Sequence, residues 1–172
     1  MTMKPSLKKI EWISFLAASL LGTLFHFVYG WSGENPVAGL FFPVNESTWE
    51  HLKLIFFPIL LLSIWEFLIF RKTYAGFVCV KFVSALIGMA LTVILFYTYT
   101  GVYGKNSEVM NILIYFISMF LAYAASFVML RRNALAGVSC CRFCYFGFLV
   151  VTLLFAVFTV FPPPIGLFAP PV

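Results

Sequence analysis

The chain has 172 residues, of which 63% are hydrophobic and only 10% are charged. Soluble globular domains are about half apolar and about a quarter charged, so this composition excludes a soluble domain and indicates that lipid is the solvent. The net charge of +5 does not indicate a nucleic-acid partner, because the basic residues form short clusters between long apolar runs and not one contiguous basic face.

Five apolar segments have the length of about 20 residues that a helix needs to cross the hydrocarbon core. Backbone groups in lipid have no water partners, so these segments must be helices. The first segment is too long for the apolar part of a secretory signal and is interpreted as a retained span. The sequence therefore predicts an all-α integral membrane protein, a bundle of five transmembrane helices in a single domain, 1–172. The expected spans are about 12–31, 49–70, 77–99, 109–130 and 143–161, followed by a proline-rich external tail at 162–172.

The basic residues predict the orientation. A cytoplasmic N-terminus leaves only Lys53 and Lys105 outside, and the positive-inside rule favours this arrangement. With an odd number of spans, the C-terminus is then expected outside. The basic residues expected at or near the cytoplasmic side are Lys4, Lys8, Lys9, Arg71, Lys72, Lys81, Arg131, Arg132 and Arg142.

Small residues and prolines add two local expectations. Small residues four apart predict close helix approach, because each pair shares one helix face. These pairs are Ala18 with Gly22, Ser84 with Gly88, and Ala122 with Ser126. Prolines at 162–164 stop the fifth helix, so the tail is expected to be extended, with Ile165, Leu167 and Phe168 lying back on the outer surface.

The polar stretch PVNESTWEHLK, Pro43–Lys53, precedes and begins the second span. Ser47 and Glu50 have the spacing of a capping box, in which a hydroxyl and a carboxylate bind exposed backbone donors at a helix start. Asn45 is a turn former just upstream. Helix capping explains these residues but not His51.

A second histidine points to the same region. His26 lies about one turn from the outer end of the first span, so it is expected at the depth of Glu50 and His51 if the first two helices are neighbours. Glu46 and Glu50, four apart, are expected on one helix face. The candidate ligand-binding residues are His26, Asn45, Glu46, Glu50, His51 and Lys53. Among them, His26, Glu50 and His51 are the candidate metal ligands, because imidazole and carboxylate are ordinary zinc ligands.

Several functions remain open for this cluster. It can be structural, through capping and interhelical hydrogen bonds, or it can bind a small ligand, an ion or a lipid headgroup. The alternatives are a metal-dependent intramembrane hydrolase, with Glu50 as general base, and a small transporter subunit that acts as an oligomer. The sequence favours a structural or binding role over an enzyme and assigns no catalytic residue. Its expected partners are membrane lipids and further copies of the chain; a divalent metal such as zinc is a candidate cofactor.

Charged residues on the cytoplasmic half predict a structural contact. Glu66 and Lys81 are expected at the same depth in the membrane if the second and third spans form an antiparallel hairpin. Because an unpaired charge in hydrocarbon is costly, an ion pair between them is expected. A proton relay from Glu66 to His51 would have to cross about 22 Å, at about 1.5 Å per residue. The apolar residues between them argue against such a relay.

The cysteines on the same half give a weak signal. Cys141 and Cys144 have the spacing of redox or metal-binding pairs, but no second pair accompanies them. The sequence assigns no role to these two residues or to Cys140.

The region from His26 to Pro58 resembles the signature of a family of uncharacterised small multi-pass bacterial membrane proteins. The shared features are the histidine late in the first span, the run SGENP at residues 32–36, and the run PVNESTWEHLK, Pro43–Lys53. The proline-rich FPPPIGLF after the last span is also similar. The resemblance implies a multi-pass protein of the bacterial cytoplasmic membrane and implies no activity.

Overall fold

Long helices dominate the computed structural model, which describes residues 6–71, 73–136 and 138–171, with the backbone alone for 138–141. Among these residues, five helices are long and apolar enough to cross a membrane, which confirms the all-α class and the number of predicted spans. The long helices are α1 (Leu7–Trp31), α3 (Thr48–Phe70), α4 (Phe77–Tyr103), α5 (Glu108–Arg131) and α6 (Val138–Val160). Two short elements accompany them, α2 (Pro36–Gly39) and the 3₁₀ turn η1 (Gly166–Phe168).

The long helices extend beyond several of the predicted span limits. Helix α1 begins at Leu7, not at residue 12, and α4 continues to Tyr103, where Gly104 ends it in the left-handed conformation (φ 70°). A hydropathy boundary marks where the apolar run ends, whereas hydrogen bonding continues the helix into the polar flank. This difference moves Glu11 from a polar flank into a helix.

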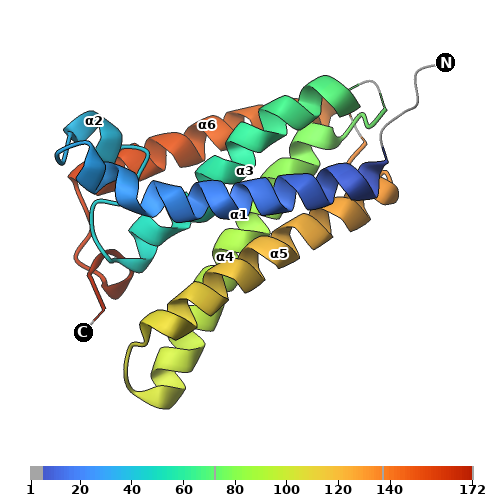
Figure 1. The fold of residues 1–172 in the computed structure, drawn as a ribbon. Helices are drawn as coiled ribbons and strands as arrows, with labels where there is room; N and C mark the ends of the chain where they lie inside the picture. The colour runs from blue at the N-terminus through green and yellow to red at the C-terminus, as the bar shows by residue number, and fades with distance from the viewer. Residues whose placement is uncertain (1–5, 72, 137, 172) are drawn as a thin grey trace.

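The two ends of the bundle differ in their chemistry. The start of α1 and the proline-rich tail after α6 lie at opposite ends (Figure 1). We call the end that carries Arg71 and Arg131 the basic end, and the end that carries residues 162–171 the tail end. The assignment of the basic end to the cytoplasm stays a prediction.

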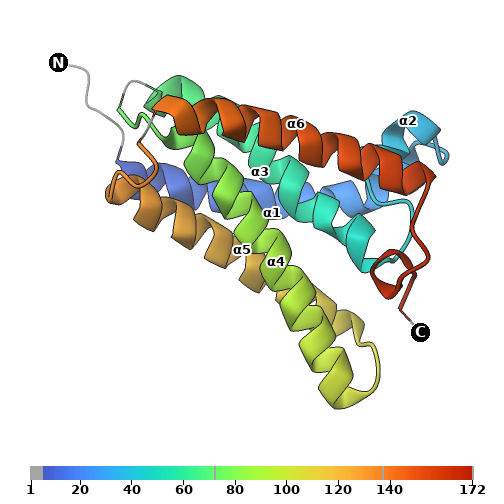
Figure 2. The ribbon, with the colours of Figure 1, turned by 180° about the vertical axis from the view of Figure 1, so that it is seen from behind.

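Helix α3 lies at the centre of the bundle and packs against α1, α4 and α6. Helices α4 and α5 form an antiparallel pair, and α5 also packs against α1. Toward the tail end, α4 and α5 diverge from the other long helices (Figures 1 and 2). This divergence separates the outer part of α5 from the start of α3.

Small residues and a proline bring α1 close to α3. A Cβ atom at Gly22 would lie 2.5 Å from the backbone oxygen of Leu54 and would also collide with the Tyr115 hydroxyl. Pro58 has no N–H to donate to the Leu54 oxygen, so this oxygen lacks its usual partner within α3. At Gly88, a Cβ would lie 2.9 Å from Ile55. Two of the predicted small-residue contacts are therefore sites of close helix approach.

Aromatic rings join α3, α6 and the tail. Phe56 of α3 packs against Phe155 of α6 with ring centroids 5.4 Å apart. In the tail, Phe168 packs against Trp49 at 4.9 Å and Phe158 at 5.3 Å. The prediction of an extended tail is therefore wrong for η1, which forms a 3₁₀ turn. This turn brings Phe168 back onto the start of α3, where its ring is partly buried.

Candidate functional site

The start of α3 fixes the loop that precedes it. Ser47 is the N-cap residue, and its hydroxyl oxygen accepts a hydrogen bond from the backbone N–H of Glu50 at 3.3 Å. The backbone N–H of Ser47 donates to Asn45 Oδ1 at 2.9 Å and not to the Glu50 carboxylate. Half of the predicted capping box therefore forms, and Glu46 is held between two constrained residues just outside the helix.

Three predicted residues converge at the tail end. His26 comes from α1, Glu46 from the loop, and His51 from the first turns of α3; each offers one ligand atom, and these atoms lie within 4.8 Å of one another. His51 Nε2 lies 3.4 Å from Glu46 Oε2, and His26 Nε2 lies 3.9 Å from Glu46 Oε1. The imidazole centroids are 5.3 Å apart. We call these three residues the His–Glu–His cluster.

The hydrogen bonding of His51 determines which ring nitrogen faces the cluster as an acceptor. His51 Nδ1 lies 2.9 Å from the backbone oxygen of Ser47. A carbonyl oxygen only accepts, so Nδ1 carries the hydrogen. In the neutral ring the lone pair is then on Nε2, directed at the Glu46 carboxylate. Two acceptors 3.4 Å apart repel each other, so this geometry needs a cation between them, either a proton on Nε2 or a metal ion.

Glu46 is favoured in its charged form. When the His51 ring also carries a proton on Nε2, its hydrogen bond lowers the pKa of Glu46 below its usual value. Partial burial opposes this shift, whereas the charges of both imidazoles add to it. Glu46 is consequently a carboxylate at neutral pH and a strong attractor for a cation.

Two adjoining cavities of about 450 Å³ and 500 Å³ meet at the cluster. The first also reaches His26 on α1, and the second reaches α4 and Pro171 of the tail. Both are lined by Glu46, His51, Leu54, Glu108, Asn111 and Tyr115. Their volumes fall within the range of about 300–1,000 Å³ that is usual for small-molecule sites. The His–Glu–His cluster therefore borders a space that is large enough for a small ligand.

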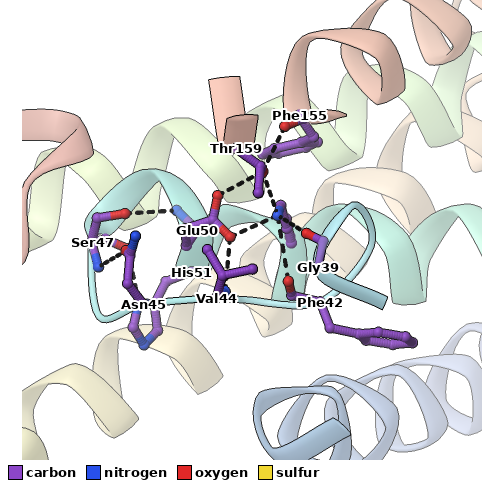
Figure 3. Close-up of polar contacts among 10 residues, drawn as sticks. Gly39, Phe42, Val44, Asn45, Ser47, Glu50, His51, Phe155 and Thr159 are labelled. Carbon is purple, nitrogen blue, oxygen red and sulfur yellow. Dashed lines mark hydrogen bonds and ion pairs between the residues drawn. The ribbon is translucent and has the colours of Figure 1, made fainter. Parts of the chain in front are cut away.

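Glu50 and Lys53 form a separate buried network (Figure 3). Lys53 Nζ lies 2.6 Å from Glu50 Oε2, and it donates hydrogen bonds to the Gly39 backbone oxygen and to Thr159 Oγ1, both at 2.7 Å. The Thr159 hydroxyl donates to Glu50 Oε1 at 2.9 Å, and the Val44 N–H donates to Oε2 at 3.0 Å. The network joins the loop, α3 and α6, and thereby supports the segment that carries Glu46.

The structure therefore places Glu46, and not Glu50, beside the two histidines. The expectation that Glu46 and Glu50 share a helix face fails because α3 begins at Thr48, so Glu46 is not helical. Glu50 and Lys53 are turned into the protein, where both are fully or almost fully buried. Asn45 acts on the backbone of Ser47, so its part in the site is to shape the loop.

Some residues around the site had not been identified from the sequence. Asn111 lines both cavities, and its Oδ1 accepts a hydrogen bond from the Tyr99 hydroxyl at 2.6 Å. A lone amide in an apolar span was the available signal for it. Thr159 gives no comparable signal, because a threonine in such a helix usually bonds to its own backbone. Its hydroxyl does lie 2.7 Å from the Phe155 oxygen, in addition to its contacts with Glu50 and Lys53.

At the basic end, the expected ion pair between Glu66 and Lys81 is present, and Glu11 also joins it. Lys81 Nζ lies 2.5 Å from Glu66 Oε2 and 2.7 Å from Glu11 Oε1. On α6, Cys144 is buried. The side chains of Cys140 and Cys141 are outside the described residues.

Comparison of the sequence with known protein families, curated proteins and solved structures places the chain in one family. Neither the curated proteins nor the solved structures contain a match to it. One family model matches residues 1–172, so it includes both the His–Glu–His cluster and the Glu50–Lys53 network. The resemblance noted for His26 to Pro58 agrees with this assignment to an uncharacterised family. The chain belongs to DUF6512, a family of unknown function.

Proposed function

We propose that the protein binds a divalent transition metal ion, in the first place Zn²⁺, at its tail end through His26, Glu46 and His51. The observation that carries this proposal is the direction of His51 Nε2. Its partner nitrogen is committed to a carbonyl oxygen, and Nε2 itself faces a carboxylate. A metal ion bound there replaces a repulsion between acceptors with two coordinate bonds.

The donor set and its spacing suit zinc. Zinc bonds of about 2.0–2.2 Å to nitrogen and oxygen in a tetrahedron separate the ligand atoms by about 3.4 Å. The distance between His51 Nε2 and Glu46 Oε2 is 3.4 Å, and that between His26 Nε2 and Glu46 Oε1 is 3.9 Å. Three protein ligands leave one position for water or a ligand in the adjoining cavities. The Ser47 carbonyl that orients His51 is the kind of outer partner that fixes a metal-binding imidazole.

Metal binding on the external side explains the site better than hydrolysis does. The basic residues favour a cytoplasmic basic end, so the cluster faces outward from the bacterial cytoplasmic membrane. The hydrolase considered from the sequence uses Glu50 as its general base, and Glu50 is engaged by Lys53 and Thr159. The proposed role is therefore capture of a metal ion, or of a small ligand through that ion, from outside the cell.

Metal analysis of the purified protein tests the proposal. We expect the wild type, incubated with zinc and then washed, to retain about one equivalent per chain. Loss of an outer partner of a metal ligand costs about 10–100-fold in affinity, so loss of a ligand itself should cost at least about 100-fold. H26A, E46A and H51A should each lose zinc accordingly, with the affinity measured by competition against a chelating dye.

The matched control is E34Q, which removes an exposed glutamate from the loop before α2 and should leave zinc binding unchanged. Each variant is compared with the wild type by size-exclusion chromatography, so that loss of folding is recognised. Equal zinc content in the wild type and in H26A/H51A would contradict the proposal, as would less than about a tenth of an equivalent in the saturated wild type.

A further inference from the structure

The second cluster of buried charges lies at the basic end, remote from the His–Glu–His cluster. Glu11 of α1, Glu66 of α3 and Lys81 of α4 meet there, and each side chain is at most 4% exposed. Lys81 Nζ lies between the two carboxylates, 2.7 Å from Glu11 Oε1 and 2.5 Å from Glu66 Oε2. We call these three residues the basic-end triad.

The triad carries one more negative group than positive. Among the described residues, Lys81 is the cation that pairs with both carboxylates, and neither carboxylate pairs with a second one. With both glutamates ionised, the triad would hold a net charge of −1 inside an apolar bundle. Removing an uncompensated charge from water costs several kcal/mol, and buried groups commonly avoid that cost by becoming neutral.

Among the residues that the structure describes, the surrounding helices supply no further positive charge to the triad. Helix α5 contributes Ser126, whose hydroxyl donates to Glu11 Oε1 at 3.1 Å, and Tyr123, whose ring centroid lies 4.9 Å from Lys81 Nζ. The Tyr123 hydroxyl is buried and, within the described residues, has no hydrogen-bond partner. The same is true of Glu11 Oε2 and Glu66 Oε1. One oxygen of each carboxylate is thus free to carry a proton.

We propose that the basic-end triad is a proton-binding site that holds one proton at neutral pH, carried by the Glu11 carboxyl group. The proton forms an O–H bond with one carboxylate oxygen, while the other carboxylate remains paired with the Lys81 ammonium. The triad is then neutral as a whole. No oxidation or reduction accompanies this step, and the proton comes from water.

A cavity of about 150 Å³ adjoins the triad at Glu11 and extends toward the start of α1. It is lined by Glu11 and Tyr123 and also by Lys8, which is exposed one turn closer to the start of α1. Glu66 lies on the other side of Lys81 and is fully buried. Proton exchange should therefore take place through Glu11 and toward the basic end, the side predicted to be cytoplasmic.

Infrared spectroscopy of the full chain in detergent tests the proposal directly. The wild type should show the carbonyl stretching band of a protonated carboxylic acid between about pH 6 and 8, with the shift that deuterated water causes, whereas an ordinary glutamic acid with a pKa of about 4.3 is ionised there. E11Q and E66Q should each lose this band, because the remaining carboxylate then forms a one-to-one ion pair with Lys81. The control E34Q, in an exposed loop, should keep it.

Stability provides a second measurement that also works if one variant folds poorly. Unfolding ionises the Glu11 carboxyl group, so the folded state binds one proton more than the unfolded state, and stability falls as pH rises. For one proton, the unfolding equilibrium constant should rise up to tenfold per pH unit in the wild type, and this dependence should disappear in E11Q and E66Q. Absence of the acid band in the wild type, or its persistence in both variants, would overturn the proposal.

Discussion

Replacement of Lys53 by methionine tests whether the buried network holds the loop that carries Glu46. The change removes the ammonium group and keeps an unbranched side chain of similar length. It leaves Glu50, which is 2% exposed, with two donors, the Thr159 hydroxyl and the Val44 N–H, and with no cationic partner among the described residues. The Gly39 backbone oxygen also loses its donor.

The expected loss of stability follows from the burial of the pair. Removing one partner of a buried ion pair costs about 3–5 kcal/mol, because the other charge remains buried and uncompensated. In a chain of this size, 1 kcal/mol corresponds to about 2–4 °C in Tm, so K53M should lower Tm by about 6–20 °C. The double variant E50M/K53M removes both charges and should recover at least about half of the loss.

Thermal unfolding in detergent, followed by circular dichroism, measures these shifts. The matched control is K105M, which removes an exposed lysine at the tail end and should change the free energy of unfolding by less than about 0.5 kcal/mol. The reasoning is refuted if K53M lies within about 1 kcal/mol of the wild type. It is also refuted if E50M/K53M is as destabilised as the sum of the two single variants, since coupled partners must deviate from additivity.

Further predictions concern the same end of the molecule. T159V removes the hydroxyl that bridges Glu50 and Lys53 and should destabilise the protein by about 1–3 kcal/mol in the same assay, whereas T152V on the same helix, whose hydroxyl bonds within α6, should have a smaller effect. G22A should cost about 1–3 kcal/mol and weaken zinc binding, because its Cβ would collide with α3 and α5, whereas G30A, with open space around it, should be neutral. Zinc affinity should fall as pH drops from about 7 to 5, by up to about 100-fold per unit where both histidines of the empty site are protonated and must lose their protons to bind zinc. Because the pKa of Glu46 is lowered, this carboxylate stays ionised across that range and adds little to the loss; an affinity that does not change with pH would exclude histidine ligands.

The membrane helices and some of their contacts could be predicted from the sequence. A bilayer allows few solutions for an apolar run of about 20 residues, so length and composition suffice to predict helices. Depth in the membrane is also a simple function of position along a helix. For this reason the contact between Glu66 and Lys81 and the meeting of His26 with His51 could be anticipated.

The positions of Glu46 and Glu50 could not be predicted, because they depend on where α3 begins. The shared-face argument holds only within a helix, and the N-cap at Ser47 places Glu46 outside it. The burial of Lys53 depends on residues 39–44 folding over it, and no sequence pattern determines the path of that loop. Glu11 was missed because a hydropathy boundary placed it outside the first span.

The interior between the two clusters is also more polar than the apolar runs indicate. Ser14 and Ser19 of α1 and Ser118 of α5 are buried between the basic-end triad and the His–Glu–His cluster. Within the described residues, their hydroxyl oxygens have no hydrogen-bond partner. Single serines barely change the mean hydropathy of a span, so the middle of the bundle is more polar than the hydropathy of its helices indicates.

X-ray absorption spectroscopy at the zinc edge tests the central claim most directly. The zinc-loaded wild type should show the multiple-scattering signature of two imidazoles, together with oxygen ligands and no sulfur, with bonds of about 2.0–2.2 Å. In H51A the signature should fall to one imidazole or the zinc should be lost. Bound zinc with no imidazole in its shell, or with the same shell in H51A as in the wild type, would contradict the assignment of His26, Glu46 and His51 as its ligands.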